Sequence, residues 1–301
     1  MEQKILIGTE NGLYTLNENL EVRFAGHEVR SLTNHNSHWW GIINHREIWR
    51  SDAGDSWNHV VSVDNVRANC LLVTTEEKLF VGTSEAHLFT LRGKTLELVH
   101  SFEKARGRDH WFTPWGGAPD VRSISSDPSG ILYVNVHVGG ILRSPDEGRS
   151  WQPIIDIHAD VHQVVFDPDS GLLLAASASG LAISDNGGES WQFITTGLHA
   201  HYLRAIAVTN RTVFVSASTG PSTDRAAIYR GALDENVSLE RCWQGLPEWF
   251  SDNIDTFCLA ASNSCIAFGT SGGFVFISSD KGQRWTVAAR DLPPVRCVVI
   301  A

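Results

Sequence analysis

Three side chains between residues 158 and 162 alternate along the chain and could do chemistry together. In an extended segment His158, Asp160 and His162 would share one face, because successive side chains point to opposite faces of a strand. His199 and His201 alternate in the same way one blade later, and His137 should lie close by at the end of the neighbouring blade's second strand. Imidazole and carboxylate groups in such a set transfer protons or hold a divalent metal ion such as zinc, iron, copper or manganese. The alternative is that these histidines only donate hydrogen bonds to the backbone.

A second set of residues could bind anions. Arginines recur where apolar stretches begin: Arg30, Arg67, Arg122, Arg204 and Arg296. This recurrence predicts one structural position around a common axis, and a ring of guanidinium groups there would bind a carboxylate, phosphate or sulfate by bidentate contacts. The alternative is that each arginine pairs with a carboxylate of a neighbouring segment, for which Asp120, Asp160 and Asp255 are suitably placed. The same carboxylates, if about 5–10 Å apart, would suit glycoside hydrolysis.

Two insertions could complete such a site. The segment 106–120 carries Trp111, Phe112 and Trp115 among glycines and prolines, which is typical of a stiff loop that stacks on a sugar ring or another ligand. It could equally pack as a hydrophobic plug. The segment 218–229 is more polar and could bring Asp224 and Arg225 inward.

From these patterns we expect three overlapping sets of functional residues. The catalytic set is His137, His162, Asp120 and Asp160. The substrate-binding set is Arg67, Arg122, Arg204, Arg225, Trp115, Tyr202 and Asp255. The metal-binding set is His137, Asp160, His162 and His201.

The elements that position these residues follow from a repeated motif. It occurs as RSDAGDSW (50–57), SPDEGRSW (144–151), SDNGGESW (184–191) and SSDKGQRW (278–285), each copy ending a hydrophobic run. The tryptophans of the second and third copies lie 40 residues apart, and the other two gaps are each 94 residues. A period of about 40 residues with many short strands is typical of a β-propeller.

The count of blades comes from a second repeat, in which a polar, an aliphatic and an ionisable residue begin an apolar stretch. Its seven copies begin at residues 28, 65, 120, 160, 202, 253 and 294. We interpret them as the innermost strands of seven four-stranded antiparallel blades, with the C-terminal strand completing the N-terminal blade. The repeated turns then lie on one face, and the beginnings of the inner strands, with the candidate residues, on the other. The whole chain, 1–301, is expected to form this single all-β domain.

The motif resembles the Asp-box (BNR) repeat, whose pattern is Ser-x-Asp-x-Gly-x-Thr-Trp. Arg50 stands at the Ser position of one copy and Asn186 at the Asp position of another. Proteins with this repeat include sialidases, seven-bladed xyloglucan hydrolases, sortilin-type receptors and photosystem II assembly factors. The resemblance implies the propeller fold and not a particular activity. Sialidases bind a carboxylate with an arginine triad, but no FRIP-like segment is present here. The photosystem assembly factors carry an arginine patch, which implies an acidic protein partner as an alternative.

Composition narrows the function classes. The formal net charge is −10, which argues against a general nucleic-acid or anionic-membrane surface. No apolar run approaches the length of about 20 residues that a membrane span needs. The five cysteines form no CxxC pair and fall in apolar strand contexts, so we expect buried free thiols and a cytoplasmic location. A closed propeller has no sheet edge that demands a partner, so a monomer is expected.

Three functions remain open at this stage. The first is a hydrolase or lyase that acts on a small anionic or carbohydrate-like substrate in a central funnel. The second is a protein-binding propeller without catalysis, and the third is a metal-dependent enzyme with a histidine and aspartate site between the fourth and fifth blades.

Overall fold

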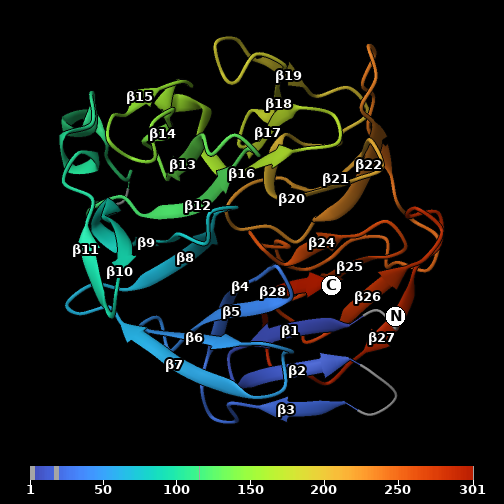
Figure 1. The fold of residues 1–301 in the computed structure, drawn as a ribbon. Helices are drawn as coiled ribbons and strands as arrows, with labels where there is room; N and C mark the ends of the chain where they lie inside the picture. Colours follow the sequence, from blue (N-terminus) through green and yellow to red (C-terminus); the bar gives the residue numbers. More distant parts are fainter. Residues whose placement is uncertain (1–3, 17–19, 115, 301) are drawn as a thin grey trace.

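Seven four-stranded antiparallel sheets surround a central axis (Figure 1), as the sequence predicts. The computed structural model describes residues 4–16, 20–114 and 116–300. The fold is therefore a seven-bladed β-propeller. Within the described residues, helical structure is limited to four 3₁₀ turns: η1 (Ser84–Ala86), η2 (Phe102–Lys104), η3 (Arg108–His110) and η4 (Ile157–Ala159). No described helix has the length and apolar character of a membrane span.

The strands follow the chain from the axis outward in each blade. The first blade consists of β28 (Val295–Ile300), β1 (Ile5–Thr9), β2 (Gly12–Leu16) and β3 (Glu21–Arg23). The second and third consist of β4 (Val29–His35), β5 (His38–Ile43), β6 (Glu47–Ser51) and β7 (Trp57–Ser62), and of β8 (Ala68–Val73), β9 (Leu79–Thr83), β10 (Leu88–Arg92) and β11 (Thr95–Leu98).

The remaining four blades follow the same order. The fourth and fifth consist of β12 (Val121–Ser126), β13 (Leu132–Val136), β14 (Gly140–Ser144) and β15 (Gln152–Pro153), and of β16 (Val161–Asp167), β17 (Leu172–Ser177), β18 (Gly180–Ser184) and β19 (Gln192–Ile194). The sixth and seventh consist of β20 (Tyr202–Thr209), β21 (Thr212–Ser218), β22 (Ala227–Ala232) and β23 (Glu240–Arg241), and of β24 (Leu259–Ala261), β25 (Ile266–Gly269), β26 (Val275–Ser278) and β27 (Thr286–Ala289).

The C-terminal strand closes the ring. β28 pairs antiparallel with β1, from Ile5 opposite Ile300 to Thr9 opposite Val295, so the innermost strand of the first blade comes from the far end of the chain. β1 and β28 accordingly lie side by side in Figure 1. This closure confirms the prediction, and it gives the first blade four strands like the others.

Inner strands share a β-bulge near their first residues. The pairing with the second strand shifts at residues 30–33 of β4, 68–70 of β8, 121–123 of β12, 161–163 of β16 and 203–206 of β20. A bulge re-aims the side chains next to it. The bulge therefore decides which residues of each blade face the axis.

The structure corrects the predicted register of two blades. Arg67 precedes β8, and Asn69 holds the bulge position, so Arg67 does not occupy the same place as the other arginines. The strand expected to begin near Asn253 begins at Leu259 instead. The Cys258 thiol contacts the Val295 carbonyl of the next blade, and the Cys70 thiol contacts the Val121 carbonyl in the same way. Phe257, the residue before Cys258, is therefore equivalent to Asn69, the residue before Cys70. In both blades the pattern placed the axial residue two positions too early, at Arg67 instead of Asn69 and at Asp255 instead of Phe257.

The four repeated turns connect the third and fourth strands, as predicted, and local hydrogen bonds hold them. In the turn before β15 the Asp146 carboxylate accepts from the backbone amides of Arg149 (3.0 Å) and Ser150 (2.8 Å). Hydrogen bonds, above all from the Ser150 hydroxyl, lower the pKa of Asp146 to about 2. Asn186 accepts in the same way from Ser190. In the first copy Ser51, one residue after Arg50, caps the turn by accepting from Gly54.

Glycines in the second strand let neighbouring blades approach closely. A Cβ atom on Gly82 would lie 2.3 Å from Val121 Cγ1 and 2.7 Å from Cys70 Sγ. Gly269 meets Val295 in the same way, and Gly8 meets the backbone of Val29. All five cysteines are free and buried, as expected. The core is thus a set of inter-blade contacts with no room for an added methyl group.

We expect Gly82→Ala to destabilise the fold by about 1–3 kcal/mol, because the added methyl group overlaps the next blade. The matched control is Gly272→Ala, where the nearest atom would lie at 3.7 Å and the backbone is not left-handed; its effect should stay within about 0.5 kcal/mol. Urea unfolding measures both. Equal stability of the two variants would show that the blades are not packed this closely.

Candidate functional site

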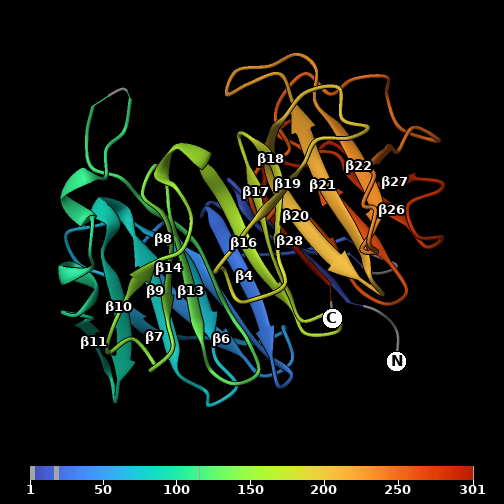
Figure 2. The same ribbon diagram turned by 90° about the horizontal axis from the view of Figure 1, so that it is seen from above.

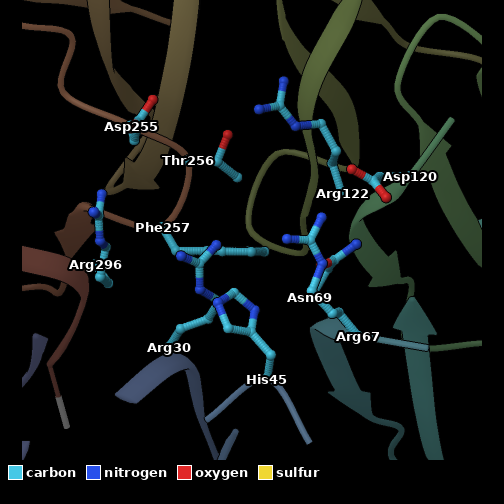
Figure 3. A pocket seen from close by; sticks show the side chains of 10 residues that line it. All are labelled: Arg30, His45, Arg67, Asn69, Asp120, Arg122, Asp255, Thr256, Phe257 and Arg296. Carbon is cyan, nitrogen blue, oxygen red and sulfur yellow. The ribbon is translucent and has the colours of Figure 1, made fainter. Parts of the chain in front are cut away.

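A pocket of about 280 Å³ lies on the axis, at the face where the inner strands begin (Figure 3). Its walls come from five blades, and we call it the axial pocket. The residues that line it are Arg30, His45, Arg67, Asn69, Asp120, Arg122, Asp255, Thr256, Phe257 and Arg296. By the strand order, the repeated turns lie on the opposite face. Four guanidinium groups against two carboxylates give this pocket a positive character within an acidic chain.

The segment before β24 crosses the axis and fills the bottom of the pocket. The Thr256 hydroxyl donates to the carbonyls of His162 (3.3 Å) and Arg204 (3.2 Å), which belong to two other blades. Phe257 has a left-handed backbone with φ of 67° and packs among buried residues of the third, fourth and first blades. An aromatic residue in this conformation is uncommon and costs free energy. The segment closes the pocket at depth.

Three of the five arginines form ion pairs with carboxylates of the protein. The choice between anion binding and structural pairing therefore differs from one arginine to the next. Arg30 contacts Glu28 at 2.5 Å, Arg204 pairs with Asp255 of the next blade, and Arg296 pairs with Glu10. Arg204 thus pairs with a carboxylate of a neighbouring blade, as that alternative proposes, whereas Glu28 and Glu10 belong to the same blades as Arg30 and Arg296. Arg122 and Arg67 make no side-chain ion pair or hydrogen bond within the described residues.

Arg122 is the more buried of these two arginines. Burial, and then the charge of Arg204, lower the pKa of the Arg122 guanidinium, whereas Asp255 and Asp160 raise it. An arginine remains charged even when its pKa falls, because its ordinary value is above 12. Arg122 therefore carries a partly desolvated positive charge into the axial pocket, where an anion would satisfy it.

Glu28 anchors one wall of the pocket. Its carboxylate lies 3.1 Å from His45 Nε2 and also binds Arg30. The hydrogen bond with His45 and the charge of Arg30 lower the pKa of Glu28 to about 2, although burial opposes this. Glu28 thus fixes the position of two side chains that face the ligand space.

Beside the pocket, His137, Asp160 and His162 converge, and we call them the His–Asp–His group. One donor atom from each residue lies within 4.8 Å of the others. His137 Nε2 is 3.2 Å from Asp160 Oδ1, and His162 Nε2 is 3.7 Å from Asp160 Oδ2. Burial raises the pKa of Asp160, but the two histidines and Arg122 lower it below its usual value.

The local structure around Asp160 differs from the prediction of an extended segment. Residues 157–159 form the 3₁₀ turn η4, because Asp156 accepts a hydrogen bond from the His158 amide at 2.8 Å. Asp160 follows with a left-handed backbone, φ 48°. His158 is exposed and does not face Asp160 and His162, so the predicted alternation is wrong. The bulge at Val161 restores the convergence of Asp160 with His162.

The fourth expected metal ligand is not part of this group. His201 is exposed and lies outside the three residues. His199, two residues earlier, is held elsewhere, with its two ring nitrogens 2.8 Å from the Tyr229 hydroxyl and 3.0 Å from the Arg225 carbonyl.

Tyr202 and Arg204 connect the His–Asp–His group with the far side of the axis. The Tyr202 ring lies 4.7 Å from that of His162, and the Arg204 guanidinium lies 5.4 Å from the Tyr202 ring. Arg204 is held by Asp255, which lines the axial pocket. These two residues therefore support the site and do not line the pocket.

The insertions contribute less than the sequence suggests. Trp111 is 9% exposed and packs against Phe102 and Arg108, as the plug interpretation requires. Phe112 is 45% exposed, Trp115 lies outside the described residues, and the chain on either side of it projects from one face (Figure 2). Asp224 and Arg225 are exposed and do not line the axial pocket.

Sequence reasoning missed three residues of the axial pocket. Asn69 replaces Arg67 at the bulge, and Thr256 and Phe257 cross the axis. A comparison of the residues that precede Cys70, Cys258 and Cys297 would have found the register, since each thiol faces the carbonyl of the next blade. Nothing in the sequence marks the crossing itself.

Comparison with known proteins finds similar folds among solved structures. No protein-family model and no curated protein matches the sequence. Among solved structures the chain is similar to YCF48 bound to D1 peptide, with 15% identity, a TM-score of 0.55 and coverage of 80% of this chain and 78% of that chain. It is also similar to an ancestral GH74 enzyme, with 16% identity and a TM-score of 0.64 over 94% of this chain and 39% of that chain.

A third similar structure is a nidogen/laminin complex, with 11% identity, a TM-score of 0.54 and coverage of 79% and 96%. The coverage of the ancestral GH74 enzyme means that this chain spans about two fifths of that enzyme's length. At these identities the likeness shows the β-propeller fold alone, and that fold serves both enzymes and binding proteins.

We expect Glu28→Gln to lower the free energy of unfolding at pH 7 and to matter less as the pH falls. A carboxyl group whose pKa is depressed on folding stabilises the protein above its unfolded pKa, near 4.5, and loses this contribution as the pH falls toward about 2. Urea unfolding at pH 7, 5 and 3.5 measures the difference between wild type and variant. Exposed Glu248→Gln is the control and should show no such trend. A constant Glu28→Gln effect over this range would contradict the assignment.

Proposed function

We propose that the protein is a small-molecule enzyme of the hydrolase or lyase type, whose anionic or carbohydrate-like substrate binds in the axial pocket. The observation that carries the proposal is Arg122, a partly desolvated guanidinium without an ion pair among the described residues. Leaving such a charge uncompensated costs stability, and a carboxylate, phosphate or sulfate would offset that cost. Arg67, which also lines the pocket, would supply a second contact.

The chemistry would come from the groups next to Arg122. The His137 amide donates to the Asp120 carbonyl at 2.8 Å, which holds the end of β13 against the pocket wall. The charge of Asp160 acts on Arg122, and the charge of Arg122 acts in turn on Asp160 and His162. A substrate anchored by Arg122 would thus lie beside Asp120 and the His–Asp–His group, where proton transfer or metal assistance is available. The similar GH74 structure makes hydrolase chemistry plausible on this fold.

A second candidate function is the binding of an acidic protein segment without catalysis. The observation that favours it is the exposed position of Arg67 at the pocket, where a partner could reach it. The similar structures that contain a peptide or a protein complex support this candidate. Its arginine contacts would then continue outside the pocket onto the surrounding face.

We expect Arg122→Gln to weaken anion binding about 10–100-fold, since a hydrogen bond to a charged group contributes about 1.5–3 kcal/mol. The melting temperature of the ligand-free protein should not fall, because the variant removes a charge that has no ion pair among the described residues. A thermal-shift screen of carboxylates, phosphates and sulfated sugars identifies the ligand, and calorimetry then measures the affinity. The control is Arg284→Gln, an exposed residue of a repeated turn on the opposite face.

Two results would redirect the assignment. Unchanged affinity of Arg122→Gln would contradict an anion site at this residue. Retention of an acidic peptide, salt-sensitive and dependent on Arg67, with no small anion bound, would favour the protein-binding function.

A further inference from the structure

The hydrogen bond of His162 fixes the state of its buried ring. His162 is 0% exposed, and its Nδ1 lies 2.5 Å from the Leu203 carbonyl oxygen. A carbonyl oxygen can only accept, so Nδ1 carries a proton, and in the neutral tautomer Nε2 presents a lone pair. Nε2 is buried without a hydrogen-bond partner in the described structure.

This lone pair faces a negative charge. Nε2 of His162 is 3.7 Å from Asp160 Oδ2, so an acceptor nitrogen and a carboxylate oxygen point at each other without a proton between them. A cation bound between the two acceptors relieves the repulsion and requires no proton on the ring.

The donors are near the spacing that a metal ion needs. Bond lengths of about 2.0–2.2 Å place the ligands of a tetrahedral site roughly 3–3.5 Å apart. His137 Nε2 and Asp160 Oδ1 are at 3.2 Å, Asp160 Oδ2 and His162 Nε2 at 3.7 Å, and all three residues fall within 4.8 Å. Small side-chain rotations would close the set. The Leu203 carbonyl on Nδ1 is the outer partner that metal-bound histidines usually have.

We propose that His137, Asp160 and His162 together bind one divalent transition-metal ion. Two imidazoles and one carboxylate suit zinc, manganese or ferrous iron and leave coordination positions open. Arg122 lies close enough for its charge to oppose the ion. An anion that touches both Arg122 and the metal would neutralise this repulsion; this part of the inference rests on the proposed function, whereas the metal site itself does not.

The test begins with metal binding by the intact chain, purified without a histidine tag. We expect elemental mass spectrometry to find about one equivalent of zinc, iron or manganese, or calorimetry to show one equivalent of added Zn²⁺ bound by the metal-depleted protein. Co²⁺ alone should give an absorption spectrum of a low-coordinate site with nitrogen ligands. Failure of the wild type to bind any of these ions would overturn the proposal.

Variants separate this site from other histidines. Asp160→Asn keeps the shape of the side chain and should reduce Zn²⁺ affinity at least tenfold, and His137→Gln provides a second variant should one of them misfold. His199→Gln is the matched control, because both ring nitrogens of His199 already contact other groups. Equal Zn²⁺ affinity of wild type, Asp160→Asn and His137→Gln would overturn the site.

One further variant keeps the two proposals distinguishable. Arg122→Gln should retain the metal and lose the anion, because Arg122 is not a ligand. Loss of metal from Asp160→Asn, with the metal kept in Arg122→Gln, supports the metal site whether or not an anion is found. Anion binding that depends on Arg122 in a protein that binds no metal would leave the proposed function standing and refute the metal site.

Discussion

The close approach of seven inner strands to one axis is the constraint on which the rest of this structure depends. Glycines at positions such as Gly82 and Gly8 let each blade press against the next. The inner strands β4, β8, β12, β16 and β20 bulge where they enter this crowded region, and a bulge both turns a side chain inward and leaves backbone groups unpaired. The Leu203 carbonyl, beside one of these bulges, accepts from His162, and that of Arg204 accepts from Thr256. Packing and site geometry therefore have one origin.

The same constraint explains what the sequence could and could not predict. Blade number, closure by β28 and the place of the repeated turns follow from local chemistry that recurs: hydrophobic runs, turn hydrogen bonds and a tryptophan. The axial residues depend on single-residue register, which no periodicity reports. A pattern of polar, aliphatic and charged residues therefore pointed to Arg67 where Asn69 lies, and to Asp255 where Phe257 lies. The convergence of His137 with Asp160 and His162 was predicted, but through an extended segment that is in fact a 3₁₀ turn.

Charge around the axis is arranged unevenly, and this unevenness carries the functional argument. Three arginines at the axis are neutralised by carboxylates of the protein. The pairs are Arg30 with Glu28, Arg204 with Asp255, and Arg296 with Glu10. Paired groups of this kind are explained by the fold. Arg122 has no such partner in the described structure, although it sits among buried strands where an unpaired charge is costly. The fold alone therefore does not explain the charge of Arg122 as it explains the paired arginines.

In the His–Asp–His group, by contrast, a positive charge is missing in the described structure between two groups that accept hydrogen bonds. Its carboxylate and the Nε2 lone pair of His162 face each other as two acceptors, while the charges of Arg122 and Arg204 act on the group. Arg122 stabilises Asp160 as an anion but cannot satisfy the lone pair of His162, because no hydrogen bond joins them. One ligand that is anionic toward Arg122, together with one cation between Asp160 and His162, would satisfy both sites at once. With both ligands bound, the anion would balance the charge of Arg122, and the cation would balance Asp160 and bind the lone pair of His162.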